Sequence, residues 1–560
     1  MGEVKRYLIT SALPYANGPL HVGHLAGAYV PADIYVRYLR LLKHDVKFIC
    51  GSDEHGAAIT MRAKTINSTP KEIVEKYHAI NKQSFKEFGI SFDIYHRTSA
   101  SLHHKVSQDF FKKLNGKNVF RTKVVEQYYD EKEEQFLADR YIQGQCPKCN
   151  YQEAFGDQCE SCGSDLSPSD LIDPRSTLSG NAPVMRRTKH WFLPMQEYQQ
   201  WVSEWIRDCQ KKEHWKKHVL GQCESWIKQG LRERAMTRDL EWGVKVPLED
   251  AKGKVLYVWL DAPIGYISAT QALTNEWEKY WKDKDTKLVH FIGKDNIVFH
   301  CIIFPILLHA HGEYTLPINI PANQFMNLEK SKISTSRNHA VWLTDYMERF
   351  PEKQDALRYY LTVNMPENKD SDFAWKEFQA KVDSDLVGVL GGFFNRTFSL
   401  IHKNFNGRVG FPKNVSDTGS KDLRNNVFSN IEKFKVEFDR YIHGYEFKKA
   451  SDTYINLARQ GNKLLHETSP WKIMGDDPNS AEYILALCME IVAVLVAYME
   501  PLLPFTCRRL KDYLEIKTDD VQQILDGDYK IEKIKIGKVI HFFERIDSEA
   551  VNRELDKLNL

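Results

Sequence analysis

Strand-like and helix-like segments alternate at the start of the chain, with glycine-bearing turns between them. An apolar run from Tyr7 to Ala12 leads into a turn, Leu13 to Pro19, that is rich in Pro, Asn and Gly. A helical pattern follows from about Val22 to Lys43, and a second apolar run, Val46 to Cys50, ends in Gly51-Ser52-Asp53-Glu54-His55-Gly56. This order of strand, glycine-bearing loop, helix and strand is typical of a doubly wound parallel sheet. We therefore predict an α/β fold with a Rossmann-type sheet.

The alternation stops near Gly116 and resumes late, so we expect an insert that splits the sheet domain. Two later runs, Lys254 to Trp259 and Leu288 to Ile292, are read as further strands, the second followed by a helix to about Ala310. Beyond about Lys376 the pattern is long and helical, and 560 residues are too many for one hydrophobic core. We expect a first half of the sheet domain (1–117), an insert (118–232) with a metal knuckle at about 142–170, a second half (233–325), a loop and linking region (326–375) and an α-helical domain (376–560).

The composition is that of a globular protein, with 42% apolar and 27% charged residues. The formal net charge of +2 does not attract a polyanion globally, so a nucleic acid would have to be held by local basic patches. The apolar run from Tyr483 to Leu503 is interrupted by Glu490, Glu500 and Pro501, and it is predicted to be a buried helix. We expect a cytoplasmic protein with neither a membrane nor DNA as its partner.

Four of the ten cysteines form two C-x₂-C pairs, Cys146 with Cys149 and Cys159 with Cys162, with nine residues between the pairs. Each pair offers two thiolates from one tight turn, and the two pairs together complete a tetrahedron around Zn²⁺. A redox pair or unrelated thiols are the alternatives, but the two pairs with their flanking glycines favour zinc. Because cysteine would fill every ligand position, the ion should be structural.

Two histidines stand where the first strand passes into the first helix, in His21-Val22-Gly23-His24. Their spacing places both on one face of the first helical turn, where backbone N–H groups and the helix dipole favour an anion. Gly23 would let a nucleotide approach the backbone closely. The pattern thus indicates a triphosphate site, although a pair of surface histidines is the alternative.

A second basic segment, Lys332-Ile333-Ser334-Thr335-Ser336-Arg337, follows the sheet domain. A serine-rich loop with flanking cations can bind phosphates as a mobile lid. Taken alone, the segment is more typical of a solvated linker.

The order of these two motifs resembles that of the class I aminoacyl-tRNA synthetases, which carry an HIGH sequence after the first strand and a KMSKS loop after the sheet. Three segments narrow the resemblance to the methionyl-tRNA synthetases: Ala12 to Gly18, Gly51 to Gly56 and Trp259 to Tyr266. The resemblance extends from Arg6 into the helical C-terminal part. It implies ATP-dependent activation of methionine, with Mg²⁺ accompanying ATP, and transfer of the methionyl group to tRNA(Met).

The resemblance also implies the site residues. His21 and His24 are expected at the ATP phosphates and Lys332 at the pyrophosphate, with Asp53 holding the α-ammonium group of methionine. The ATP-binding set is His21, Gly23, His24, Gly293, Lys294, Asp295 and Lys332. The methionine-binding set is Ala12, Leu13, Tyr15, Asp53, Trp259, Ala262, Pro263, Tyr266 and His300. For any one aromatic of this set, ordinary core packing is the alternative.

The chain departs from the family pattern at Thr335, where the KMSKS loop has its second lysine. A hydroxyl cannot replace that charge, so we expect Lys330 or Arg337 to substitute, or a weaker dependence on the loop. Our hypothesis is that Arg337 compensates in part.

The helical region resembles an anticodon-binding bundle, in which Arg396 and Trp471 match the family's anticodon contacts. Arginine can bond base edges, and an aromatic ring can stack on an unpaired base. Gly392 stands where the family usually has Asn, which removes one expected contact. A tryptophan buried in the bundle is the alternative for Trp471.

Three other functions compete with this interpretation. A class I synthetase for another amino acid is opposed by the Asp261 to Tyr266 segment and by an insert too small for a separate editing domain. Enzymes that transfer nucleotides to small molecules share the H-x-G-H turn but need no zinc insert or helical tail. A non-catalytic tRNA-binding relative would be consistent with the altered lysine loop.

Overall fold

The computed structural model describes residues 6–137, 141–156, 159, 161–162, 166–335, 337–413, 415 and 420–558. The chain forms two compact units, each assembled from stretches that are far apart in sequence. The first unit comprises Met1–Pro19, Asp45–Gln83 and Phe92–Pro321, and the second comprises Leu20–His44, Ser84–Ser91 and Ala322–Leu560.

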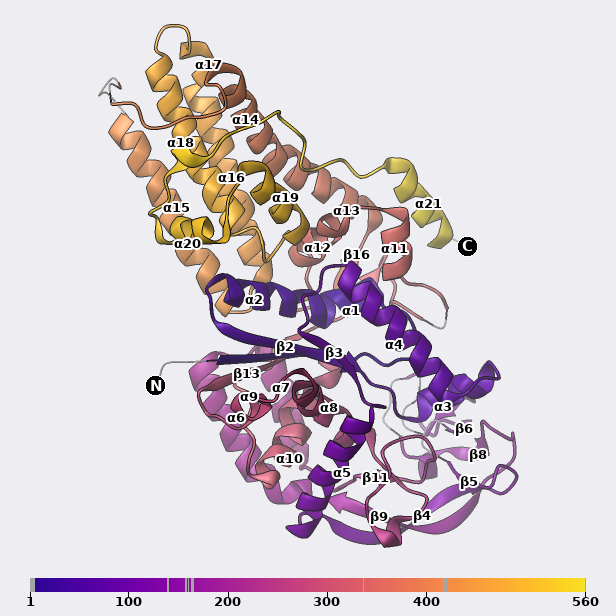
Figure 1. Ribbon diagram of the computed structural model, residues 1–560. Coiled ribbons are helices and arrows are strands. Elements are labelled where there is room, and N and C mark those ends of the chain that lie inside the picture. Colours follow the sequence, from indigo (N-terminus) through magenta and orange to yellow (C-terminus); the bar gives the residue numbers. More distant parts are fainter. Residues whose placement is uncertain are drawn as a thin grey trace. The chain divides into compact units, whose positions relative to one another are not determined.

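A parallel sheet forms the centre of the first unit (Figure 1). Four of its strands belong to the first unit, in the order β13 (Thr286–Gly293), β1 (Arg6–Ser11), β2 (Asp45–Ser52) and β3 (Ile94–Arg97). Because all four run the same way, their carboxyl ends share one edge, which is where such sheets bind ligands. The predicted α/β fold is confirmed. Strand β3 escaped prediction because it has four residues, of which only Tyr95 is buried.

The helices of the first unit include α3 (Ala57–Thr65), α5 (Ser101–Gly116), α8 (Val258–Leu273), α9 (Trp277–Trp281) and α10 (Phe304–His311). Helix α8 packs against β2, β3 and α5.

The prediction of a strand over Lys254 to Trp259 is wrong for most of these residues. Only β12 (Val255–Leu256) is extended, paired with β11 (Thr237–Arg238), and the chain enters α8 at Val258. Most of α8 is buried, so its sequence shows no polar face. Such a run gives no period by which a helix can be told from a strand.

The insert contains two antiparallel sheets and a helix pair. Strand β4 (Arg121–Asp130) pairs with β9 (Val184–Leu193), and β5 (Gln135–Phe136) and β10 (Arg234–Ala235) extend this sheet. The smaller sheet consists of β7 (Ala154–Phe155), β6 (Ile142–Gln145) and β8 (Ile172–Ser176), and it has a small apolar core of its own. Helices α6 (Gln199–Glu213) and α7 (Lys217–Gln229) follow.

The second unit begins with the helix predicted after the first strand. It consists of α1 (Val22–His24), a π-helical segment η1 (Leu25–Tyr29) and α2 (Val30–Leu41), without a break. Farther along the chain, β15 (Met326–Leu328) pairs in parallel with β16 (Ser371–Phe373), and α11 (Leu343–Arg349) and α12 (Gln354–Val363) lie between them in sequence.

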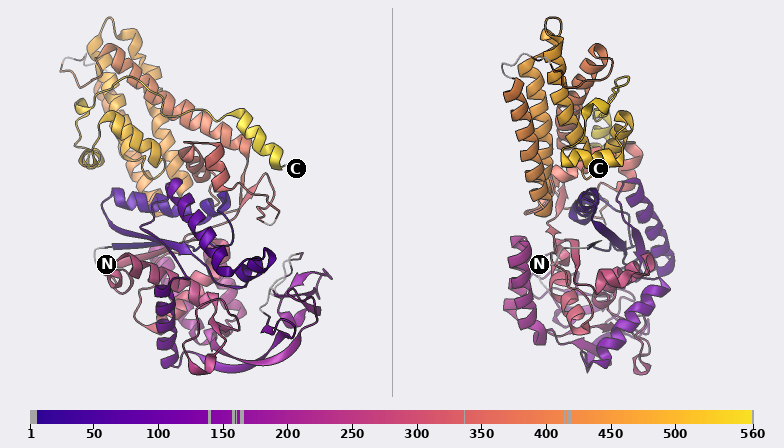
Figure 2. Two further views of the ribbon diagram at one scale, coloured as in Figure 1. Left: turned by 45° about the vertical axis from the view of Figure 1, so that its right-hand side comes forward. Right: turned by 60° about the vertical axis from the view of Figure 1, so that its left-hand side comes forward.

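The rest of the second unit is a helical bundle, as predicted: the described residues after 376 form no strand. Three long helices, α15 (Ser420–His443), α16 (Phe447–Thr468) and α18 (Pro478–Ala497), pack side by side, as the orange helices of Figure 2 show. The other helices are α13 (Trp375–Lys381), the π-helical η8 (Val382–Gly391), α14 (Gly392–Asn404), α17 (Pro470–Ile473), α19 (Pro504–Leu514), α20 (Thr518–Asp526) and α21 (Ser548–Leu558).

One described helix, α18, is long and apolar enough to cross a membrane, but 83% of its most apolar window is buried inside the protein. A buried helix was predicted here over Tyr483 to Leu503, and the observed helix begins and ends earlier.

Candidate active site and metal centre

The two histidines of the first motif cap the helix that they begin. The Nδ1 atom of His21 accepts the backbone N–H of Gly23 at 3.1 Å, and the Nδ1 atom of His24 accepts the N–H of His21 at 3.2 Å. The rings stack with their centroids 3.7 Å apart. Burial lowers the pKa of His24 to about 4, and burial together with the neighbouring His24 lowers the pKa of His21. Since each Nδ1 is an acceptor, each neutral ring carries its proton on Nε2. The turn thus provides two neutral N–H donors at a helix N-terminus.

The lysine loop lies against this histidine turn, although more than 300 residues separate them in sequence. The N–H of Val22 donates to the Val341 carbonyl at 3.1 Å, and the His21 ring lies edge-on to Trp342 with centroids 5.9 Å apart. A Cβ at Gly23 would stand 3.1 Å from Cδ1 of Ile333 and 3.0 Å from Cε1 of His21, so glycine leaves room for both side chains. The structure therefore brings the exposed Lys332 close to the first motif.

The start of the lysine loop is fixed by its backbone. Glu329 and Lys330 adopt φ angles of 46° and 65°, and the Lys330 N–H donates to Oδ1 of Asp372 at 2.7 Å. Beyond this anchor the Thr335 and Arg337 side chains are exposed. Arg337 is therefore accessible to a bound anion.

The nine residues of the methionine set all lie in the first unit, around the carboxyl edge of its sheet. Ala12 follows β1 and donates its N–H to Phe291 of β13 at 2.9 Å. Asp53 follows β2, pairs with Tyr15 and donates its N–H to the Pro14 carbonyl at 2.9 Å. Four members occur at spacings of three and four residues along α8, so they share one helix face: Trp259, Ala262, Pro263 and Tyr266.

His300, on the π-helical segment η7 (Phe299–Ile303), closes this group. Its Nδ1 lies 3.1 Å from the Asn296 carbonyl and its Nε2 lies 2.9 Å from the Tyr266 hydroxyl. A carbonyl only accepts, so Nδ1 donates to it, and Nε2 accepts from Tyr266. Leu13 packs against α8, where a Cβ at Gly265 would be only 2.8 Å from its Cδ1. The Tyr266 hydroxyl and both His300 nitrogens therefore have hydrogen-bond partners inside the protein.

A buried ion cluster under this pocket was missed from the sequence. Asp261 bonds to Nδ1 of His55 at 2.6 Å and to Nε2 of His103 at 2.5 Å, and Nδ1 of His103 bonds to Ser268 at 2.9 Å. Burial would raise the pKa of Asp261, but attraction to the two imidazoles lowers it overall. Asp261 stands inside the quoted Trp259 to Tyr266 segment, so the only available signal was a carboxylate in an otherwise apolar run.

Asp53 lies next to this cluster and accepts the N–H of His55 at 3.3 Å. Burial, and next the charge of Asp261, raise the pKa of Asp53 to about 8. The free protein therefore holds Asp53 largely protonated at neutral pH, and a cationic ligand would favour the carboxylate.

Gly293, Lys294 and Asp295 lie where β13 ends and the turn η6 (Lys294–Asn296) begins, at the same sheet edge as Ala12 and Asp53. A Cβ at Gly293 would stand 2.7 Å from the Asp295 carboxylate, which explains the glycine. Burial raises the pKa of Asp295.

The four predicted metal ligands converge. The sulfur atoms of Cys146, Cys149, Cys159 and Cys162 all lie within 4.8 Å of one another, with separations of 3.9 Å for Cys146 to Cys162 and 3.5 Å for Cys149 to Cys159. A tetrahedral zinc ion with bonds of about 2.3 Å requires sulfur separations of about 3.8 Å. The four thiols therefore fit Zn²⁺ in number, type and spacing. All ten cysteines lie in the described part of the chain, and none of them forms a disulfide.

The two predicted anticodon contacts lie on different helices of the bundle. Arg396, on α14, is exposed, and its Nε donates to the Gly392 carbonyl at 3.1 Å. Trp471, on α17, is 47% exposed, so the alternative of a tryptophan buried in the bundle is wrong.

Two family descriptions match the chain. The family described as tRNA synthetases class I (M) matches residues 7–398, and the anticodon binding domain of methionyl tRNA ligase matches residues 415–556.

Curated relatives named methionine–tRNA ligase are similar over almost the whole chain. The protein from Bacteroides fragilis is 52% identical over 555 residues, which are 99% of this chain and 81% of the relative. The protein from Porphyromonas gingivalis is 50% identical over 558 residues, with the same coverage.

A solved structure of Mycobacterium tuberculosis methionyl-tRNA synthetase with methionyl-adenylate has a TM-score of 0.79 at 20% identity, covering 97% of this chain and 100% of that one. The ligand-free form of the Mycobacterium tuberculosis protein has a TM-score of 0.72 at 19% identity, with 97% and 99% covered. At this identity, the likeness supports the fold.

Proposed function

The chain belongs to the class I tRNA synthetases of the methionine type, and on that premise we propose how its residues carry out the reaction of a methionine–tRNA ligase. In the first step the methionine carboxylate attacks the α-phosphorus of ATP, giving methionyl-adenylate and pyrophosphate. In the second step the ribose hydroxyl of the 3′-terminal adenosine of tRNA(Met) takes the methionyl group, and AMP leaves. No side-chain nucleophile is needed, so the protein positions the reactants and stabilises charge.

The phosphates of ATP are assigned to the histidine turn and the lysine loop. His21 and His24 donate neutral N–H groups from the helix N-terminus, where phosphate binding is favoured. Lys332 lies on the loop that approaches Gly23, and it would neutralise the departing pyrophosphate. Gly293, Lys294 and Asp295 complete the ATP set. Mg²⁺ would be held by the phosphates more than by protein ligands.

Methionine is assigned to the face of α8 and the residues around it. Asp53 holds the α-ammonium group, and the thioether lies against Trp259, Tyr266 and the other apolar members of the set. Sulfur–aromatic contacts of about 0.3–1.5 kcal/mol each suit this surface. An apolar pocket separates ligands that differ by one methylene by only about 1–3 kcal/mol, so the Tyr266–His300 bond must fix the shape that rejects leucine. This arrangement of α8, Asp53 and His300 is the observation that carries the proposal.

Partial compensation for Thr335 is assigned to Arg337, which is exposed beyond the anchored start of the loop. Arg337→Ala should then slow adenylate formation more than Lys330→Ala, which removes the other candidate charge. Equal rates for wild type and Arg337→Ala would remove the idea.

The C-terminal bundle is assigned to the anticodon of tRNA(Met), with Arg396 bonding a base edge and Trp471 stacking on a base. The exposure of both side chains supports this role. Zn²⁺ held by the four cysteines would brace the small sheet of the insert, without a part in the chemistry.

By chain order, we propose residues 1–117 and 233–325 as the two halves of the catalytic domain, 118–232 as the insert, 326–375 as the loop and link, and 376–560 as the anticodon domain. By contacts, Leu20–His44 groups with the C-terminal half. We also propose the cytoplasm as the compartment, because a reducing environment suits ten cysteines that form no disulfide.

The deciding experiment is amino-acid-dependent exchange of pyrophosphate into ATP. Methionine should support exchange, and His24→Ala should reduce it roughly 10²–10³-fold through loss of one donor. Exchange with leucine, isoleucine or valine in place of methionine would favour a synthetase for another amino acid. Retention of tRNA without any exchange would indicate a non-catalytic relative.

A further inference from the structure

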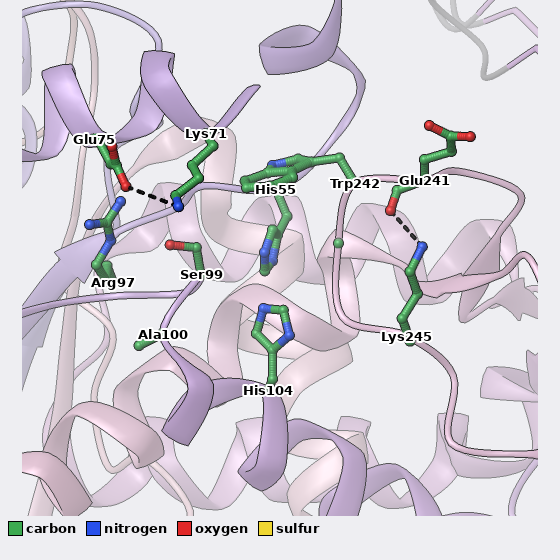
Figure 3. Close-up of a pocket in the computed structure, with 11 residues that line it drawn as sticks. His55, Lys71, Glu75, Arg97, Ser99, Ala100, His104, Glu241, Trp242 and Lys245 are labelled. Atoms are coloured by element: carbon green, nitrogen blue, oxygen red, sulfur yellow. Dashed lines mark hydrogen bonds and ion pairs between the residues drawn. The ribbon is translucent and has the colours of Figure 1, made fainter. Parts of the chain in front are cut away.

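A cavity of about 500 Å³ opens in the first unit beside the pocket assigned to methionine, and none of the assigned site residues lines it. It is bounded by α4 (Pro70–Glu87), the end of β3, the start of α5 and the loop between β11 and β12 (Figure 3). The lining residues that matter are His55, Lys71, Arg97, His104, Trp242 and Lys245.

The inner wall of this cavity is held rigidly. The Glu54 carboxylate is fully buried, and it accepts Nε of Arg97 at 2.8 Å and the Ser52 hydroxyl at 2.6 Å. The indole N–H of Trp242 donates to the Glu54 carbonyl at 2.6 Å, which fixes that ring. These bonds hold a guanidinium and an indole in place before any ligand arrives.

The two lysines of the cavity are only weakly compensated by carboxylates. Lys71 lies 3.9 Å from Glu75, but both side chains are largely exposed, at 73% and 52%, so this pair is weak. Lys245 donates to the backbone carbonyl of Glu241 at 2.6 Å, while Figure 3 shows the Glu241 carboxylate turned away from it. The Arg97 charge is already offset by the Glu54 carboxylate, so these two lysines are the cations of the cavity that favour an anion.

Flat rings line the same cavity. The ring of His55 lies edge-on to both of its neighbours, with centroids 5.3 Å from His104 and 5.9 Å from Trp242 (Figure 3). The Nε2 atom of His104 is buried and has no hydrogen-bond partner within the described residues. A nucleotide could use all three features of this cavity: its base can stack on a ring and bond to the unpartnered nitrogen, and its phosphate can bind the nearby cations.

The cavity also lies where the second step needs a ligand. His55 belongs to both places: it lines the cavity, and its backbone N–H bonds to Asp53, the residue assigned to the methionine ammonium group. A nucleotide held here would be a close neighbour of the methionyl group.

We propose that this cavity receives an unpaired nucleotide of the tRNA 3′ end during the second step, with its phosphodiester at Lys71, Arg97 and Lys245 and its base against Trp242 or His104. The inference rests on the proposed function. A free mononucleotide is the competing occupant.

The test is a thermodynamic cycle of tRNA-binding measurements. One change reverses the charge of two lysines in the cavity, and the other removes the 3′ end of the tRNA. Dissociation constants are measured for full-length tRNA(Met) and for the same tRNA lacking its three terminal nucleotides, with wild type and with a Lys71→Glu, Lys245→Glu double variant. The matched control is Lys112→Glu, an exposed lysine of α5 outside the cavity whose ammonium lies 4.0 Å from Asp109. The double variant should bind full-length tRNA roughly tenfold more weakly and truncated tRNA almost as well as wild type does.

Each remaining outcome counts against the inference. Equal weakening of both tRNAs, or of neither, would show that the cavity does not contact the 3′ end. AMP or CMP that binds wild type but not the double variant, with tRNA affinities unchanged, would make the cavity a mononucleotide site. Pyrophosphate exchange tells failure of the proposed function from failure of this inference. If wild type shows no methionine-dependent exchange, the proposed function is wrong. If exchange is normal but the effects of the double variant and of tRNA truncation on binding free energy simply add, only this inference is wrong.

Discussion

The two nitrogens of His21 have separate tasks, and paired substitutions can measure each one. Its Nδ1 accepts the Gly23 N–H at 3.1 Å and caps the helix, which leaves Nε2–H for the phosphate contact that we propose. The amide oxygen of asparagine can stand near the Nδ1 position, and the amide nitrogen of glutamine can stand near Nε2. His21→Asn therefore keeps the cap and loses the donor, while His21→Gln keeps the donor and loses the cap.

We expect one variant to lose mainly reaction rate and the other to lose mainly folding stability. Loss of one preorganised donor costs about 2.7–4 kcal/mol of transition-state stabilisation, so His21→Asn should slow adenylate formation roughly 10²–10³-fold. Loss of a helix cap costs about 0.5–2 kcal/mol of folding free energy, so His21→Gln should lower the stability while its rate stays closer to that of wild type.

Single-turnover adenylate formation and urea unfolding measure these two quantities independently. Because burial and the neighbouring His24 keep the pKa of His21 low, the rate of the wild type should show no titration of this ring between pH 6 and pH 8. If His21→Asn were as fast as wild type, or if His21→Gln were as slow as His21→Asn, the assignment of Nε2 as the phosphate donor would be wrong.

Three further predictions concern the ionisable and metal-binding groups. Burial and Asp261 raise the pKa of Asp53 to about 8, so KM for methionine should fall roughly tenfold per pH unit from pH 6 toward pH 8 as the carboxylate forms, and a flat profile would contradict its role. Burial opposes ionisation of Asp33, but Arg37 and Arg358 outweigh it and lower its pKa to about 2. The resulting stability, about 2–3 kcal/mol, is complete above about pH 5 and is lost as the pH falls toward 2; urea unfolding of wild type and Asp33→Asn across this range should reveal it, and an unchanged difference would refute it. Removal of zinc by a chelator, or Cys149→Ser, should expose the small core around β6 to proteolysis at unchanged bundle stability, whereas equal protease resistance with and without the metal would exclude a structural zinc.

The sequence determined much of this protein because some of its signals are local. The alternation around Tyr7 to Cys50 is enough to predict a parallel sheet, since each strand and helix follows from apolar runs and turn residues nearby. The cysteine spacing predicted the sulfur cluster for the same reason: each C-x₂-C pair is closed by its own turn. The long helical tail was equally readable.

Only the tertiary structure decided which distant residues meet. The strand expected at Lys254 to Trp259 is the start of a buried helix, and only that helix places Trp259 and Tyr266 on one face. No local pattern could show that Asp261 would bond to both His55 and His103, because those contacts depend on how α8 packs against α5 and the sheet. A sequence specifies short-range geometry through backbone preference and periodicity, whereas contacts between distant segments arise from packing the whole chain.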